Sequence, residues 1–168
     1  MARIRLLHYR VCGFSQEDIE EMAVETRGEH LLIEFRGCEG PVLNDSKALQ
    51  ALMERAVAAA QATIVNSVFH TFAPQGVTGV VVVEESHFSV HTWPEHGYVA
   101  VDVYTCGECY PQRAREVLRT GLAATSVEWM LIERGLGRPA GDIHIADTGL
   151  ETDTDSVRPG PIRHTATG

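Results

Sequence analysis

Residues 77–83 have the sequence VTGVVVV, and after Glu84-Glu85 residues 86–92 have the sequence SHFSVHT. The first segment is nearly continuous valine, which is typical of a central strand or of a strand buried on both faces. The second segment alternates apolar with polar side chains, which is the pattern of a strand with one buried face. We therefore expect two consecutive strands joined by a turn at the two glutamates.

Further strands and two helices are expected on either side of this pair. The segment 46–60 carries apolar residues at helical spacing and follows Asn44 and Asp45, either of which can cap a helix. A second helix is expected at 111–122, with a proline near its first turn. The remaining segments rich in strand-forming residues are 30–35, 63–72, 98–105 and 127–133.

The expected order of elements is β-α-β-β-β-β-α-β, which indicates an α+β fold. We expect a two-layer α/β sandwich, with one largely antiparallel sheet and two helices on one of its faces. Because the valine strand is apolar throughout, the other face of the sheet also needs cover. A second copy of the chain is the simplest cover, so we expect a homodimer with four layers in the order αββα.

All of these elements fall within residues 29–135, which we expect to form one domain. Residues 1–28 are expected to be an N-terminal extension. Residues 136–168 are rich in Gly, Pro, Thr and Asp, and we expect a flexible C-terminal tail there.

The charge of the chain limits its partners. Its 168 residues include 14 Lys and Arg against 23 Asp and Glu, which gives a formal net charge of −9. A nucleic-acid-binding protein is expected to carry a basic face, and an anionic membrane surface attracts basic segments. The sequence has neither a long apolar run nor the apolar core of a secretory signal. We expect a cytoplasmic protein that binds a small molecule, with no nucleic-acid or membrane partner.

The four cysteines do not form the framework of a small secreted domain, so we expect reduced thiols. Cys106 and Cys109 form a C-x-x-C pair, a spacing found in redox sites and in zinc sites. A zinc site needs about two more ligands, and the remaining cysteines, Cys12 and Cys38, are isolated in the sequence. We expect no metal, and we expect Cys109 to be incidental or to form a regulatory disulfide with Cys106.

An ordered series of short blocks runs from residue 69 to residue 107. The blocks are FH at 69–70, PQGV at 74–77, ESH at 85–87, HTWPE at 91–95, GY at 97–98, VD at 101–102 and TCG at 105–107. With these blocks the sequence resembles the prokaryotic S-adenosylmethionine decarboxylase proenzymes, over most of residues 29–134. The long pattern, with its rare Trp and His, is far more specific than a three-residue motif.

The resemblance implies a pyruvoyl-dependent decarboxylase that makes its own cofactor. The hydroxyl of Ser86 attacks the carbonyl of Glu85 and forms an ester, elimination cuts the chain, and hydrolysis leaves a pyruvoyl group on residue 86. The products are chains 1–85 and 86–168. The pyruvoyl ketone then captures the substrate amine as a Schiff base and accepts the electrons released when CO2 leaves. The family also implies a homodimer in which two protomers build each site.

The resemblance assigns further roles residue by residue. His91 matches the histidine of processing, and Cys106 matches the proton donor in catalysis. Phe72 matches the aromatic residue that stacks on adenine, and Glu95 matches the acid that binds the ribose hydroxyls. Thr78 stands where the family usually has a serine linked to processing, and it keeps the hydroxyl.

One point of geometry stays open in this assignment. A regular strand places Ser86 and His91 on opposite faces, because successive side chains alternate. We therefore expect either a bulge between them or a histidine that acts from a turned segment.

The retained Phe72 and Glu95 favour S-adenosylmethionine as substrate, and hence a role in spermidine synthesis. His96, where the family often has Tyr, and the altered stretch 107–111 keep arginine or ornithine open as substrates of the same chemistry. A non-catalytic regulatory paralogue is a further alternative, which the joint presence of Ser86, His91 and Cys106 disfavours.

Overall fold

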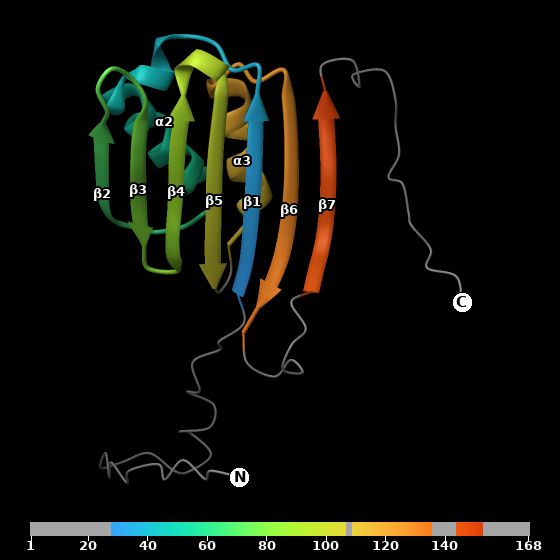
Figure 1. Cartoon of the computed structure of the whole chain (residues 1–168). Coiled ribbons are helices and arrows are strands. Elements are labelled where there is room, and N and C mark those ends of the chain that lie inside the picture. The colour runs from blue at the N-terminus through green and yellow to red at the C-terminus, as the bar shows by residue number, and fades with distance from the viewer. Residues whose placement is uncertain (1–27, 107–108, 136–143, 153–168) are drawn as a thin grey trace, which may run out of the picture.

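The computed structural model describes residues 28–106, 109–135 and 144–152. Within these residues seven strands form one antiparallel sheet in the order β2-β3-β4-β5-β1-β6-β7, and the two helices α2 and α3 cover one face of it (Figure 1). The elements are β1 (Gly28–Arg36), η1 (Pro41–Asn44), α2 (Ser46–Ala59), β2 (Ile64–Thr71), β3 (Val77–Val83), β4 (Ser86–Trp93), η2 (Pro94–His96), β5 (Tyr98–Cys106), α3 (Pro111–Gly121), β6 (Ser126–Arg134) and β7 (His144–Thr152).

The expected two-layer α+β fold is confirmed, with one antiparallel sheet and both helices on one face. Local sequence accounts for helix α2, since the Asp45 side chain caps it by accepting hydrogen bonds from the backbone N–H groups of Lys47 and Ala48. Its apolar side chains recur at helical spacing and form a fully buried face. Helix α3 begins at Pro111, a residue that is tolerated in the first turn.

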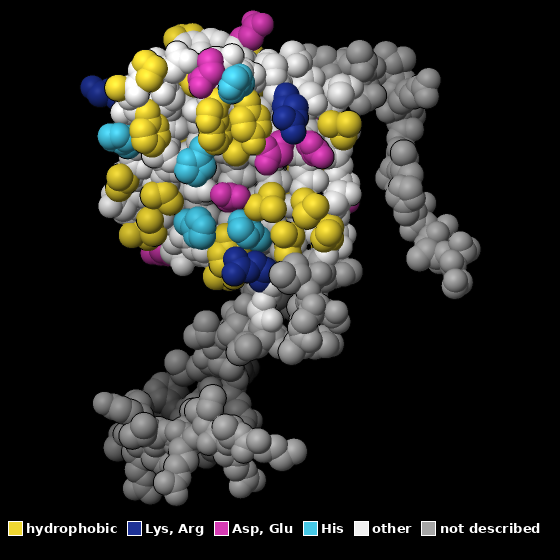
Figure 2. All heavy atoms as spheres, in the orientation of Figure 1, with side chains coloured by type: hydrophobic (Ala, Val, Ile, Leu, Met, Phe, Trp, Pro, Cys, Tyr) yellow, Lys and Arg dark blue, Asp and Glu magenta, His cyan; other side chains and the backbone are white. Residues whose placement is uncertain are grey.

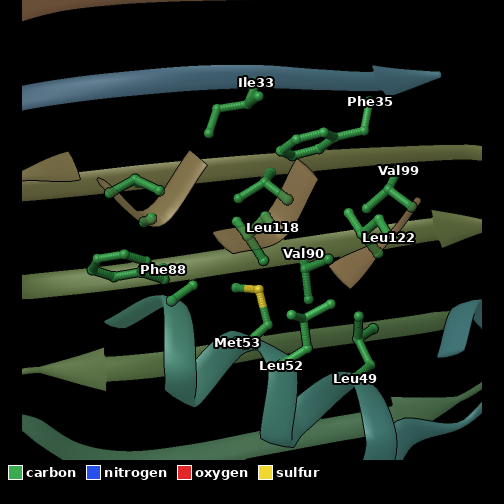
Figure 3. Close-up of a cluster of buried hydrophobic side chains, with 14 of the residues drawn as sticks. Ile33, Phe35, Leu49, Leu52, Met53, Phe88, Val90, Val99, Leu118 and Leu122 are labelled. Carbon is green, nitrogen blue, oxygen red and sulfur yellow. The ribbon is translucent and has the colours of Figure 1, made fainter. Parts of the chain in front are cut away.

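The core lies between the helices and the inner face of the sheet. Figure 3 shows Met53 of α2 and Leu118 of α3 turned toward the sheet, where Phe88 and Phe35 are fully buried. Each such side chain contributes about 1.5–3 kcal/mol to folding by leaving water. Alternate residues of β5, among them Val101, supply the same inner face. The core thus fixes which side chains of every strand point outward.

The outer face of the sheet is not covered by any described residue of the same chain. It carries apolar side chains that are 39–58% exposed, namely Val68, Phe72, Val82 and Trp93. Figure 2 shows this face, where hydrophobic side chains lie among histidines and a few charged groups. Val81 and Val83 of the valine strand are buried against the helices, whereas Val82 points outward and is 40% exposed.

The expected flexible tail is wrong for residues 144–152, which form strand β7 at the edge of the sheet. Gly149 lies so close to the ring of Trp129 on β6 that a Cβ atom there would come within 1.9 Å of it. On the helix side, Arg115 of α3 contacts the same ring and bonds to the carboxylate of Glu151 at 3.0 Å. Local composition missed this strand because a docked neighbour, rather than strand propensity, orders it. Of the expected extension 1–28, Gly28 begins β1, and residues 1–27 lie outside the described residues, as does the rest of the tail.

Candidate active site

The turn between β3 and β4 places Ser86 in an unusual backbone conformation. Glu84 and Glu85 form the two-residue turn, and Ser86 follows as the first residue of β4. Its φ angle is +151°, a region that residues with a side chain rarely adopt. Such a conformation costs on the order of 1–3 kcal/mol and persists where the surrounding structure holds it. The peptide bond between Glu85 and Ser86 is therefore next to a strained residue.

The carbonyl oxygen of Glu85 accepts two hydrogen bonds from one residue. The backbone N–H of Cys106 donates to it at 3.0 Å, and the Cys106 thiol donates to it at 2.8 Å. Cys106 reaches this position because it ends β5, where Ser86 pairs with the preceding Thr105. Two donors on one carbonyl oxygen polarise the C=O bond and stabilise negative charge on the oxygen when a nucleophile adds to the carbon.

Two further contacts hold the turn. The carboxylate of Glu85 accepts a hydrogen bond from the backbone N–H of Thr63 at 3.0 Å, which ties the turn to the start of β2. The Ser86 hydroxyl lies 3.2 Å from Nδ1 of His87. The ring of His87 in turn packs edge-on against the ring of Tyr104, its cross-strand partner on β5. The turn is thus fixed from both neighbouring strands.

Thr78 and His91 form a separate pair on the outer face of the sheet. They are cross-strand partners on β3 and β4, and the Thr78 hydroxyl lies 2.8 Å from Nδ1 of His91. The His91 ring also packs near the exposed ring of Trp93. The hydroxyl of Thr78 is therefore in contact with His91, the other residue that the resemblance links to processing.

Phe72 and Glu95 lie at the same end of the sheet as the Thr78–His91 pair. Phe72 is 50% exposed and meets the ring of His70 edge-on, with ring centroids 4.9 Å apart. Glu95 lies in η2, where its carboxylate accepts a hydrogen bond from the Gln75 side chain at 2.9 Å. Gln75 belongs to the loop between β2 and β3, so this bond joins the two loops that carry Phe72 and Glu95.

The candidate residues thus fall into two groups at opposite ends of one sheet. In Figure 1 the turn before Ser86 and the end of β5 lie at the bottom, whereas the loop after β2 and the end of β4 lie at the top. Strand β4 runs unbroken through both residues and pairs with both neighbours without a register shift, so neither the bulge nor the turned segment expected between Ser86 and His91 is present. Five residues of strand separate their Cα atoms by roughly 16 Å. One chain does not bring Ser86 and His91 together.

The cysteines differ in their surroundings. Burial raises the pKa of the Cys38 thiol to about 11, which suits a core residue. Burial also raises the pKa of Cys109, and the nearby Glu85 and Cys106 add to the shift. Within the part of the chain that the structure describes, no three His, Cys, Asp or Glu side chains are grouped to hold a metal ion. In the same part, no helix is long and apolar enough to cross a membrane.

Three participants in this geometry were not expected from the sequence. They are the backbone N–H of Cys106, the N–H of Thr63 and the Gln75 side chain. The first two are main-chain groups, which leave no mark in a sequence, and their positions follow from strand register. Gln75 lies in the block at 74–77, and only its bond to Glu95 reveals what the side chain does.

A solved structure shares this fold. The crystal structure of the adenosylmethionine decarboxylase from Aquifex aeolicus matches 70% of this chain and 98% of that one, with 36% identity and a TM-score of 0.61. Over residues 29–135 the sequence matches the S-adenosylmethionine decarboxylase family, and the chain belongs to this family.

Relatives agree with that assignment. The chain is 48% identical to the S-adenosylmethionine decarboxylase proenzyme of Moorella thermoacetica over 113 residues, which cover 67% of this chain and 90% of that protein. It is 45% identical to the proenzyme of Thermotoga maritima over 113 residues, 67% of this chain and 87% of that protein. Strand β7 begins after residue 135, the last residue of the family match.

Proposed function

We propose that the chain is a self-processing, pyruvoyl-dependent S-adenosylmethionine decarboxylase that acts in the cytoplasm and supplies spermidine synthesis. The observation that carries the proposal is the carbonyl of Glu85, which accepts two hydrogen bonds from Cys106 next to the strained Ser86. Family membership and the names of the relatives support the same function.

Processing begins when Oγ of Ser86 attacks the carbonyl carbon of Glu85. Negative charge develops on the Glu85 oxygen, where the N–H and the thiol of Cys106 donate. The C–N bond then breaks, which leaves an ester between Glu85 and Oγ and a free amine on residue 86. The strain at the φ of +151° favours this step, because breaking the peptide bond releases it.

Elimination completes the cut. A base removes the α-proton of residue 86, the bond from Cβ to Oγ breaks, and the carboxylate of Glu85 leaves as the new C-terminus. The dehydroalanine that remains rearranges to an imine, and water replaces the nitrogen, which departs as ammonia. The presence of Ser86 together with His91 and Cys106 fits the formation of a pyruvoyl group at residue 86.

The Thr78–His91 pair can take part in processing only if it acts on Ser86 of a second copy of the chain. Each protomer holds Glu85, Ser86 and Cys106 at one end of the sheet and the Thr78–His91 pair at the other. In such a dimer the outer faces of two sheets meet, and the twofold axis lies in the plane between them, perpendicular to the strands. This axis places one end of each sheet opposite the other end of the partner's sheet. The partner's His91 then lies beside Ser86 as the base for elimination. The exposed apolar side chains of this face support such a homodimer.

Substrate binding and decarboxylation use the same two groups of residues, one from each end of the sheet. The pyruvoyl group, once formed, supplies a carbonyl that binds the substrate amine and accepts the electrons of the bond to CO2. Cys106 delivers a proton to the substrate carbon, because its thiol lies 2.8 Å from the carbonyl oxygen of Glu85 and hence next to residue 86. Phe72 offers an exposed ring for adenine, and Glu95, held by Gln75, offers acceptors for ribose hydroxyls.

The proposal is tested by the release of CO2 from carboxyl-labelled S-adenosylmethionine, arginine and ornithine. We expect release from S-adenosylmethionine by the wild type and none by Ser86→Ala, which lacks the precursor hydroxyl. Phe72→Ala is expected to raise KM for S-adenosylmethionine. Release from arginine or ornithine alone would keep the pyruvoyl chemistry and replace the substrate. A cleaved protein with no release from any of the three would contradict the decarboxylase function.

A further inference from the structure

His87 contacts the hydroxyl of Ser86, although the two residues are neighbours in a strand. Side chains of successive strand residues normally point to opposite faces and do not meet. At Ser86, whose φ is +151°, the hydroxyl nevertheless lies 3.2 Å from Nδ1 of His87. The strained residue at the scissile peptide thus has an imidazole within hydrogen-bond distance of its nucleophilic hydroxyl.

The imidazole of His87 is held in place from the neighbouring strand. It is half-buried, and its ring packs against Tyr104 at a centroid distance of 5.9 Å with an interplanar angle of 63°. The Tyr104 ring is itself covered by the guanidinium of Arg134. These contacts limit rotation of the His87 ring, so that Nδ1 keeps facing the hydroxyl.

The other histidines on this part of the sheet have different partners. Nδ1 of His91 lies against Thr78 at the far end of β4, and His30 lies between Asp102 and Arg134. Among the described residues, His87 is the imidazole within hydrogen-bond distance of the Ser86 hydroxyl. A distance of 3.2 Å is at the long end of the range in which a general base takes a proton.

We propose that His87 is the general base of the first stage of processing, acting within its own chain. In the tautomer protonated on Nε2, Nδ1 accepts the proton of Oγ as Oγ bonds to the carbonyl carbon of Glu85. The imidazolium then gives this proton to the nitrogen of Ser86 as the C–N bond breaks, which yields the ester and a neutral amine. This inference rests on the proposed function. It assigns ester formation to His87 of the same chain and elimination to the partner's His91.

The test follows cleavage of freshly translated full-length protein by intact mass. His87→Gln and His87→Asn are compared with the wild type and with His70→Gln, a matched change at an exposed histidine of β2. We expect both His87 variants to cleave about 100-fold more slowly, since general base catalysis contributes roughly that much or more. We expect His70→Gln to cleave at the wild-type rate. Thermal unfolding of the uncut chains shows which variants keep the fold, and only those are scored.

Neutral hydroxylamine tells where a slow variant stops, because it splits esters and leaves amides intact. A His87 variant is expected to resist hydroxylamine, whereas His91→Ala is expected to be split between residues 85 and 86. Added imidazole is expected to speed cleavage of His87→Ala by at least about tenfold, which a merely structural role would not allow.

A second readout separates action within the chain from action by the partner. Coexpressed Ser86→Ala chains, which supply an intact His87 and an intact His91, are expected to rescue His91→Ala but not His87→Ala. Rescue of His87→Ala by these chains would overturn the inference, as would a folded His87 variant that cleaves within about threefold of wild type. An uncut wild type would contradict the proposed function itself, which distinguishes the two failures.

Discussion

The thiol and the backbone N–H of Cys106 both donate to the carbonyl oxygen of Glu85, at 2.8 and 3.0 Å. The two residues are distant in sequence and meet because the end of β5 pairs with the start of β4. One side chain thereby touches the bond that processing is proposed to cut and lies where the substrate is proposed to react afterwards. The two roles predict that changes at Cys106 affect both stages.

Replacing Cys106 with Ala removes one of the two donors and leaves the backbone N–H. We expect Cys106→Ala to slow self-cleavage by about 100-fold, since the loss of one oxyanion donor typically costs this much. Cys106→Ser keeps a donor and is expected to lose less. The neighbouring Cys109→Ser is the control and is expected to cleave normally. Intact mass against time after translation measures all three, and wild-type cleavage by Cys106→Ala would contradict the role in processing.

The strain at Ser86 is measurable in chains that do not cleave. Ser86→Ala and Ser86→Gly both lack the hydroxyl and are expected to remain uncut. Glycine adopts a φ of +151° without the clash of a Cβ atom, so the glycine variant is expected to be more stable by about 1 kcal/mol. Urea unfolding of the two variants gives the difference in the free energy of unfolding. An alanine variant of equal or greater stability would show that the backbone at this position is not strained.

Strand β7 is expected to contribute to stability, because its backbone and side chains are docked on β6 and α3. A Cβ atom at Gly149 would collide with the ring of Trp129, so Gly149→Ala is expected to lower the unfolding midpoint clearly. Glu151→Gln weakens a partly buried ion pair with Arg115 and is expected to cost about 1 kcal/mol. Thermal unfolding in the uncut Ser86→Ala background compares them. Equal midpoints for both variants and their parent would mean that residues 144–152 do not pack on the sheet.

Stability is expected to fall in mild acid because of His30. Burial lowers the pKa of His30 below its ordinary value of 6.5, an effect that nearby Asp102 opposes and that Arg134 and His87 reinforce. The unfolded chain therefore binds a proton more readily than the folded chain. The contribution of neutral His30 is fully present above about pH 6.5 and is lost as the pH falls toward the folded pKa.

Urea unfolding at fixed protein concentration, between about pH 7 and pH 5, tests this sign. His30→Gln in the uncut Ser86→Ala background is expected to show a flatter pH dependence than Ser86→Ala alone. Identical slopes for the two proteins would show that His30 does not carry the effect.

Sequence alone predicted the sheet, both helices and the grouping of elements into layers, because apolar periodicity is strong in segments such as 46–60 and 98–105. It missed β7, whose sequence has little apolar character and whose order depends on Trp129 and Arg115 of other elements. It also named the candidate side chains without their positions. Strand register, rather than residue identity, decides that Cys106 reaches Glu85 and that His91 does not reach Ser86.

Self-processing at Ser86 can be observed in the intact mass of freshly purified wild-type protein under denaturing conditions. We expect two chains, 1–85 and 86–168, of which the second is lighter by one molecule of ammonia than a chain with a free N-terminal serine. This mass is that of a pyruvoyl group at residue 86. A single uncut chain of 168 residues, or a cut chain that keeps its N-terminal serine, would contradict it.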